Sequence, residues 1–268
     1  MDAMKFDVLM SVYHREQPQY LSECLQSLLK QSKKADKVVL VEDGEISDDM
    51  KRVIEQYRLP LNIRSVRLDR NYGLAVALNE GLRFCDSELV VRMDSDDIAY
   101  PGRFARQVAY MTENPDISVS SACIEEVDDQ DNVLGFRVLP LDDQSIRKFA
   151  VKRNPISHPC SVFRRSDVLA VGGYPLLKTS QDYALWSIMM VRGYRFGNVE
   201  EVLLKMRTGT AFYGRRGYEY LRHEIELLRF QRDIEFLNSF DYRINLASRA
   251  FLRLAPVFVK NILYKKFR

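Results

Sequence analysis

Three carboxylates stand within four residues at Asp94-Ser95-Asp96-Asp97, directly after an apolar run at positions 88–93. Carboxylates this close repel one another unless a cation lies between them. One or two carboxylates, completed by phosphate oxygens and water, form the ligand set that Mg²⁺ or Mn²⁺ prefers. The cluster therefore indicates a divalent-metal site. Its alternatives are a solvated acidic turn or a cap for a helix near Pro101.

Polar and charged residues also follow three earlier candidate strands. They are Tyr13-His14-Arg15-Glu16, Glu42-Asp43-Gly44 and Asp69-Arg70-Asn71-Tyr72-Gly73. Ligands of open α/β sheets bind beyond the carboxyl ends of the strands, where such loops gather. We therefore expect four consecutive loops to meet at one edge of a sheet.

The apolar runs themselves predict the elements that position these loops. Short runs rich in β-branched residues predict strands near residues 7–12, 37–41, 62–67 and 88–93. Between them, leucines recur at helical spacing, as at Leu21, Leu25 and Leu28. Parallel strands need helical crossovers, so the chain is predicted to have an α/β fold with a mainly parallel, doubly wound sheet flanked by helices.

The pattern beyond Pro101 is mixed. It predicts helices near 103–112 and 142–151, strands near 117–124 and 133–138, a loop entering a strand at 157–163, a helix that begins near Ser180, and a strand at 202–206. A basic, glycine-punctuated loop at 207–217 precedes helices near 218–237 and 242–267, the second of which Pro256 is expected to kink or divide.

Composition describes a soluble chain that forms a core. With 268 residues, 46% of them hydrophobic and 29% charged, disorder, collagen-like repeats and a small disulfide scaffold are excluded. The four cysteines lie far apart, so we expect reduced thiols. No run of about 18 apolar residues is present and the N-terminus lacks a signal-peptide pattern. These features predict a cytoplasmic protein.

Charge is distributed unevenly along the chain. The formal net charge is +3, yet residues 192–268 hold 16 basic and 8 acidic residues, and no acid follows Asp241. The segment 242–268 interleaves apolar residues with seven cations. A basic amphipathic segment of this kind favours binding to an anionic membrane surface. The alternative is a helix packed on its own domain. Nucleic acid is not expected as a partner, since no recognised binding motif accompanies the charge.

Five short motifs occur along the first 190 residues, and their order and spacing can be compared with those of known families. The motifs are Val8-Leu9-Met10-Ser11-Val12-Tyr13, Val41-Glu42-Asp43-Gly44, Asn71-Tyr72-Gly73-Leu74-Ala75, Met93-Asp94-Ser95-Asp96-Asp97 and Gln181-Asp182-Tyr183-Ala184-Leu185-Trp186. The set resembles family 2 glycosyltransferases of the GT-A fold, and in particular the bacterial enzymes that build O-antigen or exopolysaccharide repeats on a lipid carrier.

The resemblance implies a division of the chain. A GT-A domain would occupy residues 1–215, with a nucleotide-binding half at about 1–100 and an acceptor half at about 101–215. A helical, basic, amphipathic extension would follow at 216–268.

The resemblance also implies roles on the donor side. Ser11, Val12 and Tyr13, together with Asp43, would hold the uracil of a UDP-sugar. Asp94 would lie near the ribose and the metal, and Asp96 would bind Mn²⁺ or Mg²⁺ directly. Asp97 would cap the following helix.

Further donor contacts are expected from two loops. Arg70 and Asn71 precede a helix whose N-terminus would face the nucleotide. Arg207, Arg215 and Arg216 would belong to a mobile lid that covers the diphosphate, with a solvated loop as the alternative.

On the acceptor side, the resemblance makes Asp182 the catalytic base, although the usual Glu-Asp pair is Gln181-Asp182 here. Helix capping is the structural alternative for this residue. His158, a lone histidine before Pro159, would line the acceptor site or lie near the metal, or else be a buried, hydrogen-bonded loop residue. Trp186 would pack against an acceptor sugar, or else fill the core.

The expected activity is inverting, metal-dependent transfer of a hexose, galactose or glucose, from a UDP-sugar to a polyprenyl-pyrophosphate-linked N-acetylhexosamine. The enzyme would work peripherally on the inner face of the bacterial cytoplasmic membrane. A sugar nucleotidyltransferase is one alternative. A non-catalytic, membrane-associated scaffold that binds nucleotide-sugar is another.

Overall fold

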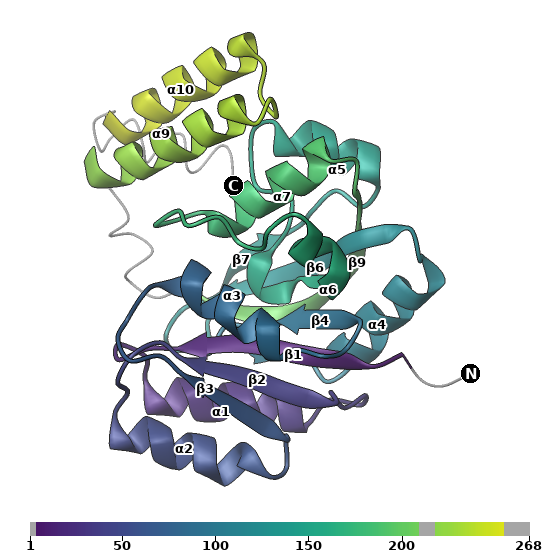
Figure 1. Cartoon of the computed structure of the whole chain (residues 1–268), viewed down its shortest axis with the longest axis vertical. Coiled ribbons are helices and arrows are strands. Elements are labelled where there is room, and N and C mark those ends of the chain that lie inside the picture. The colour runs from purple at the N-terminus through teal and green to yellow at the C-terminus, as the bar shows by residue number, and fades with distance from the viewer. Residues whose placement is uncertain (1–3, 209–217, 255–268) are drawn as a thin grey trace.

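The computed structural model describes residues 4–208 and 218–254. In this part of the chain nine strands form one sheet in the order β3-β2-β1-β4-β8-β6-β9-β5, with β7 paired to β6 (Figure 1). The strands are β1 (Phe6–Val12), β2 (Lys37–Glu42), β3 (Ile63–Arg67), β4 (Leu89–Arg92), β5 (Ile98–Ala99), β6 (Ile117–Val127), β7 (Val133–Arg137), β8 (Val162–Arg164) and β9 (Arg195–Arg207).

The first four strands of the chain pair in parallel, as the βα pattern predicts. The second half is mixed, because β8 runs antiparallel to both β4 and β6 while β9 runs parallel to β6. Strand β9 begins seven residues before the predicted start at 202. The added part contains Gly197, Asn198 and Glu200, which weaken a strand signal in the sequence, and pairing with β6 overrides it.

Helices cover both faces of the sheet. Their bounds are α1 (Pro18–Leu29), α2 (Asp48–Arg58), α3 (Leu74–Phe84), α4 (Arg103–Glu113), α5 (Asp143–Ala150), the 3₁₀ turn η1 (His158–Cys160), α6 (Arg165–Ala170), α7 (Gln181–Val191), α9 (Tyr218–Asp233) and α10 (Ser239–Leu254). Helices α1, α2 and α4 pack in one apolar core. Helices α3, α5, α6 and α7 pack in a second core on the other face. This layering is the doubly wound arrangement.

Helix α2 was not predicted from the sequence. Its start is fixed by Ser47, whose side chain accepts a hydrogen bond from the Met50 backbone NH. Met50, Ile54 and Tyr57 form its buried side at spacings of four and three residues.

Helices α9 and α10 lie side by side beyond α7, at the top of Figure 1. Leu227 of α9 packs against Tyr183 and Ala184, and the Gln231 side chain donates to Ser187 Oγ of α7 at 2.9 Å. The predicted helix at 218–237 therefore ends at Asp233, and the next begins at Ser239. Pro256 lies outside the described residues. Within the described part of the chain, no helix has the length and apolar character needed to cross a membrane.

All four cysteines are buried and free, as expected. Burial raises the pKa of the Cys85 thiol to about 12 and the pKa of the Cys24 thiol well above its ordinary value. The Cys24 thiol also donates to the Asp94 carbonyl at 3.3 Å, so α1 supports the acidic loop after β4.

Candidate active site

The acidic loop Asp94–Asp97 begins just after β4, at the carboxyl edge of the parallel strands. Its first carboxylate is paired with the guanidinium of Arg92, which is buried in the core and also donates to the Met93 carbonyl. A second buried cation, Arg103, donates to the Arg92 carbonyl at 2.6 Å. Two interior arginines therefore set the path of the chain into the loop.

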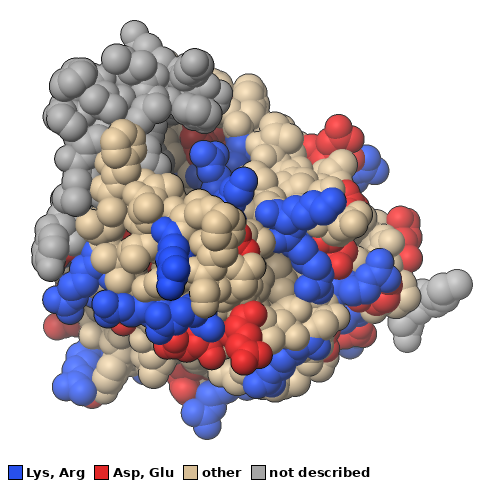
Figure 2. Space-filling view, turned by 90° about the horizontal axis from the view of Figure 1, so that it is seen from above, with Lys and Arg blue, Asp and Glu red and all other residues tan. Residues whose placement is uncertain are grey.

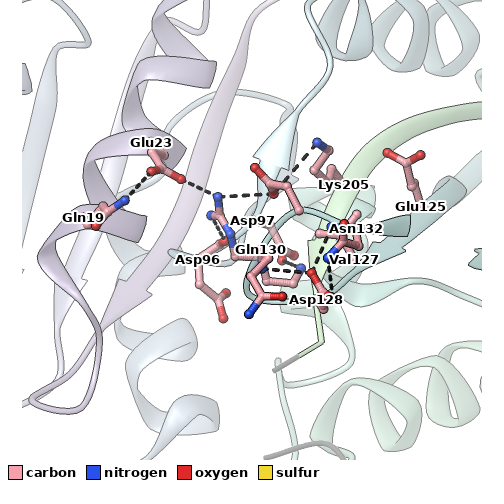
Figure 3. Close-up of polar contacts among 12 residues, drawn as sticks. Gln19, Glu23, Asp96, Asp97, Glu125, Val127, Asp128, Gln130, Asn132 and Lys205 are labelled. Atoms are coloured by element: carbon pink, nitrogen blue, oxygen red, sulfur yellow. Dashed lines mark hydrogen bonds and ion pairs between the residues drawn. The ribbon is translucent and has the colours of Figure 1, made fainter. Parts of the chain in front are cut away.

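Arg207, the last residue of β9, supports the acidic loop through contacts with Asp96, Asp97 and Glu23, which are labelled in Figure 3. Its backbone NH donates to Asp97 Oδ1 at 3.0 Å and its guanidinium donates to the Asp96 carbonyl at 2.7 Å. The same guanidinium pairs with Glu23 of α1 and lies 4.5 Å from the ring centre of Tyr20. Arg207 is thus part of a strand and is held in place, whereas the sequence predicted it in a mobile lid.

Asp97 has a different role from the one expected. Helix α4 has Gly102 at its N-cap and no side-chain cap, so Asp97 does not cap it. The carboxylate instead receives the Arg207 backbone NH. Its other oxygen, Oδ2, is buried with no hydrogen-bond partner among the described residues.

Glu16, from the loop after β1, adds a fourth carboxylate. Burial, together with the charges of Asp96 and Asp94, raises the pKa of Glu16 to about 7. Burial and the Asp94 charge raise the pKa of Asp96 to about 6, and the pKa of Asp97 lies well above its ordinary value. We define Glu16, Asp94, Asp96 and Asp97 as the acidic wall. Its crowded charge would be relieved by a cation.

The acidic wall fits a divalent metal held mainly by its substrate. Among the described residues, no group of three or more His, Cys, Asp or Glu side chains is arranged to hold a metal ion without other ligands. A site of one or two carboxylates completed by phosphate oxygens needs no such group. Asp96 is the ligand predicted from the sequence. Next to it, the Oδ2 atom of Asp97 is buried and has no hydrogen-bond partner among the described residues.

A cleft of about 1100 Å³ joins the acidic wall to residues from the second half of the chain. Its lining includes Tyr13, the acidic wall, Arg207, His158 and Asp182, and we define its second wall as Phe136, Val138, Arg153, Asn154 and Asp182. The fold therefore brings six predicted site residues into one cavity: Tyr13, Asp94, Asp96, His158, Asp182 and Arg207.

Asp182 is the second residue of α7. Its Oδ2 atom accepts a hydrogen bond from Asn154 Nδ2 at 2.6 Å, and no side-chain hydrogen bond caps the helix at Ser180. Burial is the main cause that raises the pKa of Asp182, and the Asp94 charge adds to it. A carboxylate held by an amide and facing a cleft is placed to accept a proton.

His158 lies in η1 at the base of the cleft and is 8% exposed. Its Nε2 atom is 3.1 Å from the Tyr174 hydroxyl. Burial, followed by the charge of Arg92, lowers the pKa of the ring well below its ordinary value. His158 is therefore a neutral, hydrogen-bonded residue of the cleft wall.

Trp186 does not line the acceptor site as predicted. It is fully buried on α7 and packs among His158, Phe163 and Phe196. The helix turns this side chain toward the sheet, so Trp186 fills the core and supports His158 from behind.

The remaining donor-side residues lie outside the lining of the cleft. Ser11 and Val12 belong to β1. Asp43 is buried, and its two carboxylate oxygens accept the backbone NH groups of Tyr72 and Gly73 at 2.8 and 3.0 Å. Asp43 therefore closes the loop before α3, and its predicted contact with uracil stays a prediction.

Neighbouring residues complete this closure. The Asn71 side chain donates to the Asp43 carbonyl at 3.3 Å, and the Arg70 guanidinium lies 4.7 Å from the ring centre of Tyr72. Arg215 and Arg216 lie outside the described residues.

Glu16, Asn154 and Arg153 are site residues that the sequence did not single out. Glu16 had a usable signal, because it stands in one of the four loops expected to meet at the sheet edge. Asn154 and Arg153 had none, since only the fold brings the segment after α5 beside α7.

An α/β sheet with an acidic loop at the end of its fourth strand, facing a carboxylate across a shared cleft, has the architecture of the GT-A glycosyltransferases. The model of the family described as "Glycosyl transferase family 2" matches residues 7–171. The chain belongs to this family, and it is a glycosyltransferase. This assignment decides against a sugar nucleotidyltransferase and against a non-catalytic scaffold.

Two relatives are similar over nearly their whole length. The chain is 37% identical to an amylovoran biosynthesis glycosyltransferase, AmsE, of Erwinia amylovora, over 98% of this chain and 99% of the relative. It is 35% identical to a UDP-Gal:alpha-D-GlcNAc-diphosphoundecaprenol beta-1,3-galactosyltransferase of Escherichia coli, over 99% of this chain and 97% of the relative.

Solved structures share the fold. The mannosyltransferase PcManGT of Pyrobaculum calidifontis, solved with GDP-Man and Mn²⁺, aligns with a TM-score of 0.67 and 18% identity, over 94% of this chain and 70% of that one. At this identity the comparison supports the GT-A fold alone.

Proposed function

We propose that this glycosyltransferase moves a hexose, galactose or glucose, from a UDP-sugar to an N-acetylhexosamine linked through diphosphate to a polyprenyl lipid. The product would be a step in O-antigen or exopolysaccharide repeat-unit synthesis. The observation that carries the proposal is the cleft that joins the acidic wall to Asp182. The name of the Escherichia coli relative, a UDP-Gal:alpha-D-GlcNAc-diphosphoundecaprenol galactosyltransferase, supports the choice of donor and acceptor. The amylovoran biosynthesis relative supports a role in polysaccharide synthesis.

The chemistry is a single displacement with inversion. Asp182 accepts the proton of the acceptor hydroxyl, whose oxygen attacks the anomeric carbon from the side opposite UDP. The new carbon–oxygen bond forms as the bond to UDP breaks, so an α-linked donor gives a β-linked product. Asn154 donates to Asp182 Oδ2 and so orients the carboxylate that receives the proton.

The acidic wall would serve the leaving group. A Mn²⁺ or Mg²⁺ ion held by Asp96 would neutralise the charge that develops on the diphosphate. The Mn²⁺ in the Pyrobaculum structure supports a divalent metal. Asp94 lies beside this position, and Arg215 and Arg216 are proposed to contact the same phosphates.

Tyr13, which lines the cleft, is proposed to contact the uracil together with Ser11, Val12 and Asp43. Arg70 and Asn71 are proposed to contribute polar contacts from the loop before α3. His158 is proposed to line the acceptor site as a neutral group.

We also propose peripheral association with the cytoplasmic face of the membrane through the C-terminal region. On α10, Phe240, Ile244 and Phe251 are exposed at spacings of four and seven residues, which places them on one side of the helix. The residues after this stripe carry cations and no acids. On the face seen in Figure 2, basic and acidic side chains of the described residues are interleaved, so the proposal rests on α10 and the tail.

The transfer is tested with a panel of UDP-sugars and synthetic lipid-diphosphate N-acetylglucosamine or N-acetylgalactosamine, with and without Mn²⁺, followed by linkage analysis. Asp96→Ala should abolish the metal-dependent transfer, whereas Asp129→Ala, an acid of the same cleft, should retain it. Wild-type transfer that is unchanged by chelation, or an active Asp96→Ala variant, would refute the role of the metal.

The membrane proposal is tested by flotation with vesicles that contain anionic lipid. Replacing Phe240, Ile244 and Phe251 by Ser should release the protein, while replacing exposed Leu59, Leu169 and Leu176 by Ser should not. Equal flotation of both triple variants would show that α10 does not anchor the protein.

A further inference from the structure

Two arginines of the cleft, Arg15 and Arg153, have side chains with no hydrogen-bond or ion-pair partner among the described residues. Arg153 lies just after α5, is exposed, and lines the second wall. Among the described residues its guanidinium makes no hydrogen bond or ion pair. By contrast, Arg137 pairs with Glu126 at 2.6 Å and Arg207 pairs with Glu23. An unpaired guanidinium in a ligand cleft is a ready site for an anion, because its planar fork matches phosphate oxygens.

The chain fixes Arg153 on the side of the catalytic base. Its neighbour Asn154 donates to Asp182 Oδ2 at 2.6 Å, so the two residues belong to the same short segment beside α7. A sugar whose hydroxyl reaches Asp182 carries its anomeric substituent only a few bonds away. An anionic group on that substituent is therefore within reach of Arg153.

Two apolar side chains stand exposed in the same wall. Phe136 is 60% exposed and Val138 is 71% exposed, and both line the cleft. Large apolar side chains at the mouth of a ligand cleft commonly mark a contact with an apolar part of the ligand. Sugar rings and bases also pack on aromatic side chains, but a lipid diphosphate is the ligand that offers an anion together with a hydrocarbon chain.

We infer that Arg153 binds the diphosphate of the acceptor and that Phe136 and Val138 contact the first carbons of its lipid chain. The inference rests on the proposed function, because it takes Asp182 as the group that receives the acceptor hydroxyl. It adds a subsite that recognises the carrier rather than the sugar.

Other charged residues of the cleft limit where the diphosphate binds. Arg15 also lines the cleft, but it follows β1 beside Tyr13 and Glu16 and so belongs to the donor side. Asp129 lies in the turn between β6 and β7 and disfavours an anion there. These placements leave the Arg153 side of the cleft for the acceptor diphosphate.

The first test measures binding of a decyl diphosphate that carries no sugar, by calorimetry on the full-length protein. In Arg153→Gln the Kd should rise about tenfold or more, as loss of a charge-assisted contact predicts. Lys152→Gln is the matched control, since Lys152 is the exposed neighbour that does not line the cleft. The Kd for UDP should stay within twofold in both variants.

Three results would overturn the assignment of Arg153. The first is an unchanged Kd for decyl diphosphate in Arg153→Gln. The second is an equal loss for UDP, which would place Arg153 at the donor diphosphate. The third is the same loss in Arg15→Gln without one in Arg153→Gln, which would move the subsite to the other wall.

The second test concerns the lipid chain. Wild-type protein should bind decyl diphosphate several-fold more tightly than butyl diphosphate, and Phe136→Ser should remove most of this preference. Val133→Ser is the control, because Val133 is 54% exposed on the same strand and does not line the cleft. A preference that survives in Phe136→Ser, or is lost equally in Val133→Ser, would refute the apolar contact.

Transfer assays separate this inference from the proposed function. If the wild type transfers no hexose from any UDP-sugar while decyl diphosphate binding still depends on Arg153, the proposed function fails and the subsite stands. If transfer to the lipid-diphosphate acceptor is normal in Arg153→Gln, the proposed function stands and the subsite fails.

Discussion

The two walls of the cleft are built in different ways. The acidic wall is tied to the core by Arg92 and Arg207, and through them to β4, β9 and α1. The second wall presents exposed side chains, Phe136, Val138 and Arg153, on a hairpin and a connecting segment. Substitutions in the acidic wall should therefore alter both stability and activity. Substitutions in the second wall should alter recognition or, at Asp182, catalysis, while the fold stays intact.

Asp182→Asn should give the largest effect and should separate activity from stability most clearly. Removing a general base lowers kcat by about 10²–10⁴-fold. The free energy of unfolding should not fall, since a neutral amide replaces a carboxylate whose charged form burial disfavours. Steady-state kinetics and urea denaturation check the two parts. Asp167→Asn, another first-turn acid, is the control. Near-normal kcat in Asp182→Asn would refute the assignment of the base.

Gly44→Ala should show how closely the loops at the carboxyl edge of the sheet are packed. Gly44 has φ of +84°, and an added Cβ would lie 2.6 Å from the Asn71 backbone nitrogen. The strained backbone and the clash together should lower the free energy of unfolding by about 2–3 kcal/mol. Gly135→Ala has open space and should stay within about 0.5 kcal/mol of wild type. Equal unfolding free energies of the two variants would show that the backbone around Gly44 rearranges at little cost.

Arg207→Met should sharpen the same comparison. It leaves the Asp96 carbonyl without its donor and Glu23 without its partner. Because Glu23 is partly exposed, the loss in unfolding free energy should be only about 1–2 kcal/mol. Donor KM should rise as the acidic loop loses its support. Arg195→Met, which breaks an exposed pair with Asp116, should change neither quantity. If Arg207→Met is as stable as wild type and has a normal donor KM, Arg207 does not support the acidic wall, and the two walls do not differ in how substitutions affect stability.

The smallest expected effect is the dependence of stability on pH through Asp182. Its folded-state pKa is raised, so its favourable contribution is complete below the unfolded pKa and is lost as pH rises through the folded pKa. Asp182→Asn should therefore gain stability relative to wild type between pH 4 and pH 7. Urea denaturation at both values measures this. The acidic limb of kcat in the wild type should likewise lie above that of an ordinary Asp. If the gain in unfolding free energy of Asp182→Asn over wild type becomes smaller as pH rises, the pKa of Asp182 is not raised.

Sequence patterns of single strands and loops correctly predicted which loops lie at the carboxyl edge of the sheet. The loops after β1 and β4 delivered Tyr13, Asp94 and Asp96 to the cleft, because the end of a parallel strand fixes the edge to which its loop belongs. Asp182 was predicted from the order of the five motifs, and His158 was singled out as a lone histidine before Pro159. The doubly wound fold followed from alternating βα periodicity.

The sequence-based predictions failed for residues whose position depends on contacts between segments far apart in the chain. Trp186 faces the core because α7 packs on β9 and η1, and no spacing within the helix reveals that direction. Arg207 became an internal support because β9 extends to it and Glu23 meets it from α1. Asn154 reaches Asp182 only through a contact between residues 28 positions apart.

The four buried thiols have a practical consequence for work on this enzyme. A thiolate is the reactive form of cysteine, and burial that raises the pKa of Cys24 and Cys85 suppresses it. A single cysteine introduced at an exposed position, such as Phe251 on α10 or Val133 on the hairpin, should react with a maleimide probe far faster than any native one. Fluorescent or spin labels can therefore be attached to either region of the otherwise natural chain.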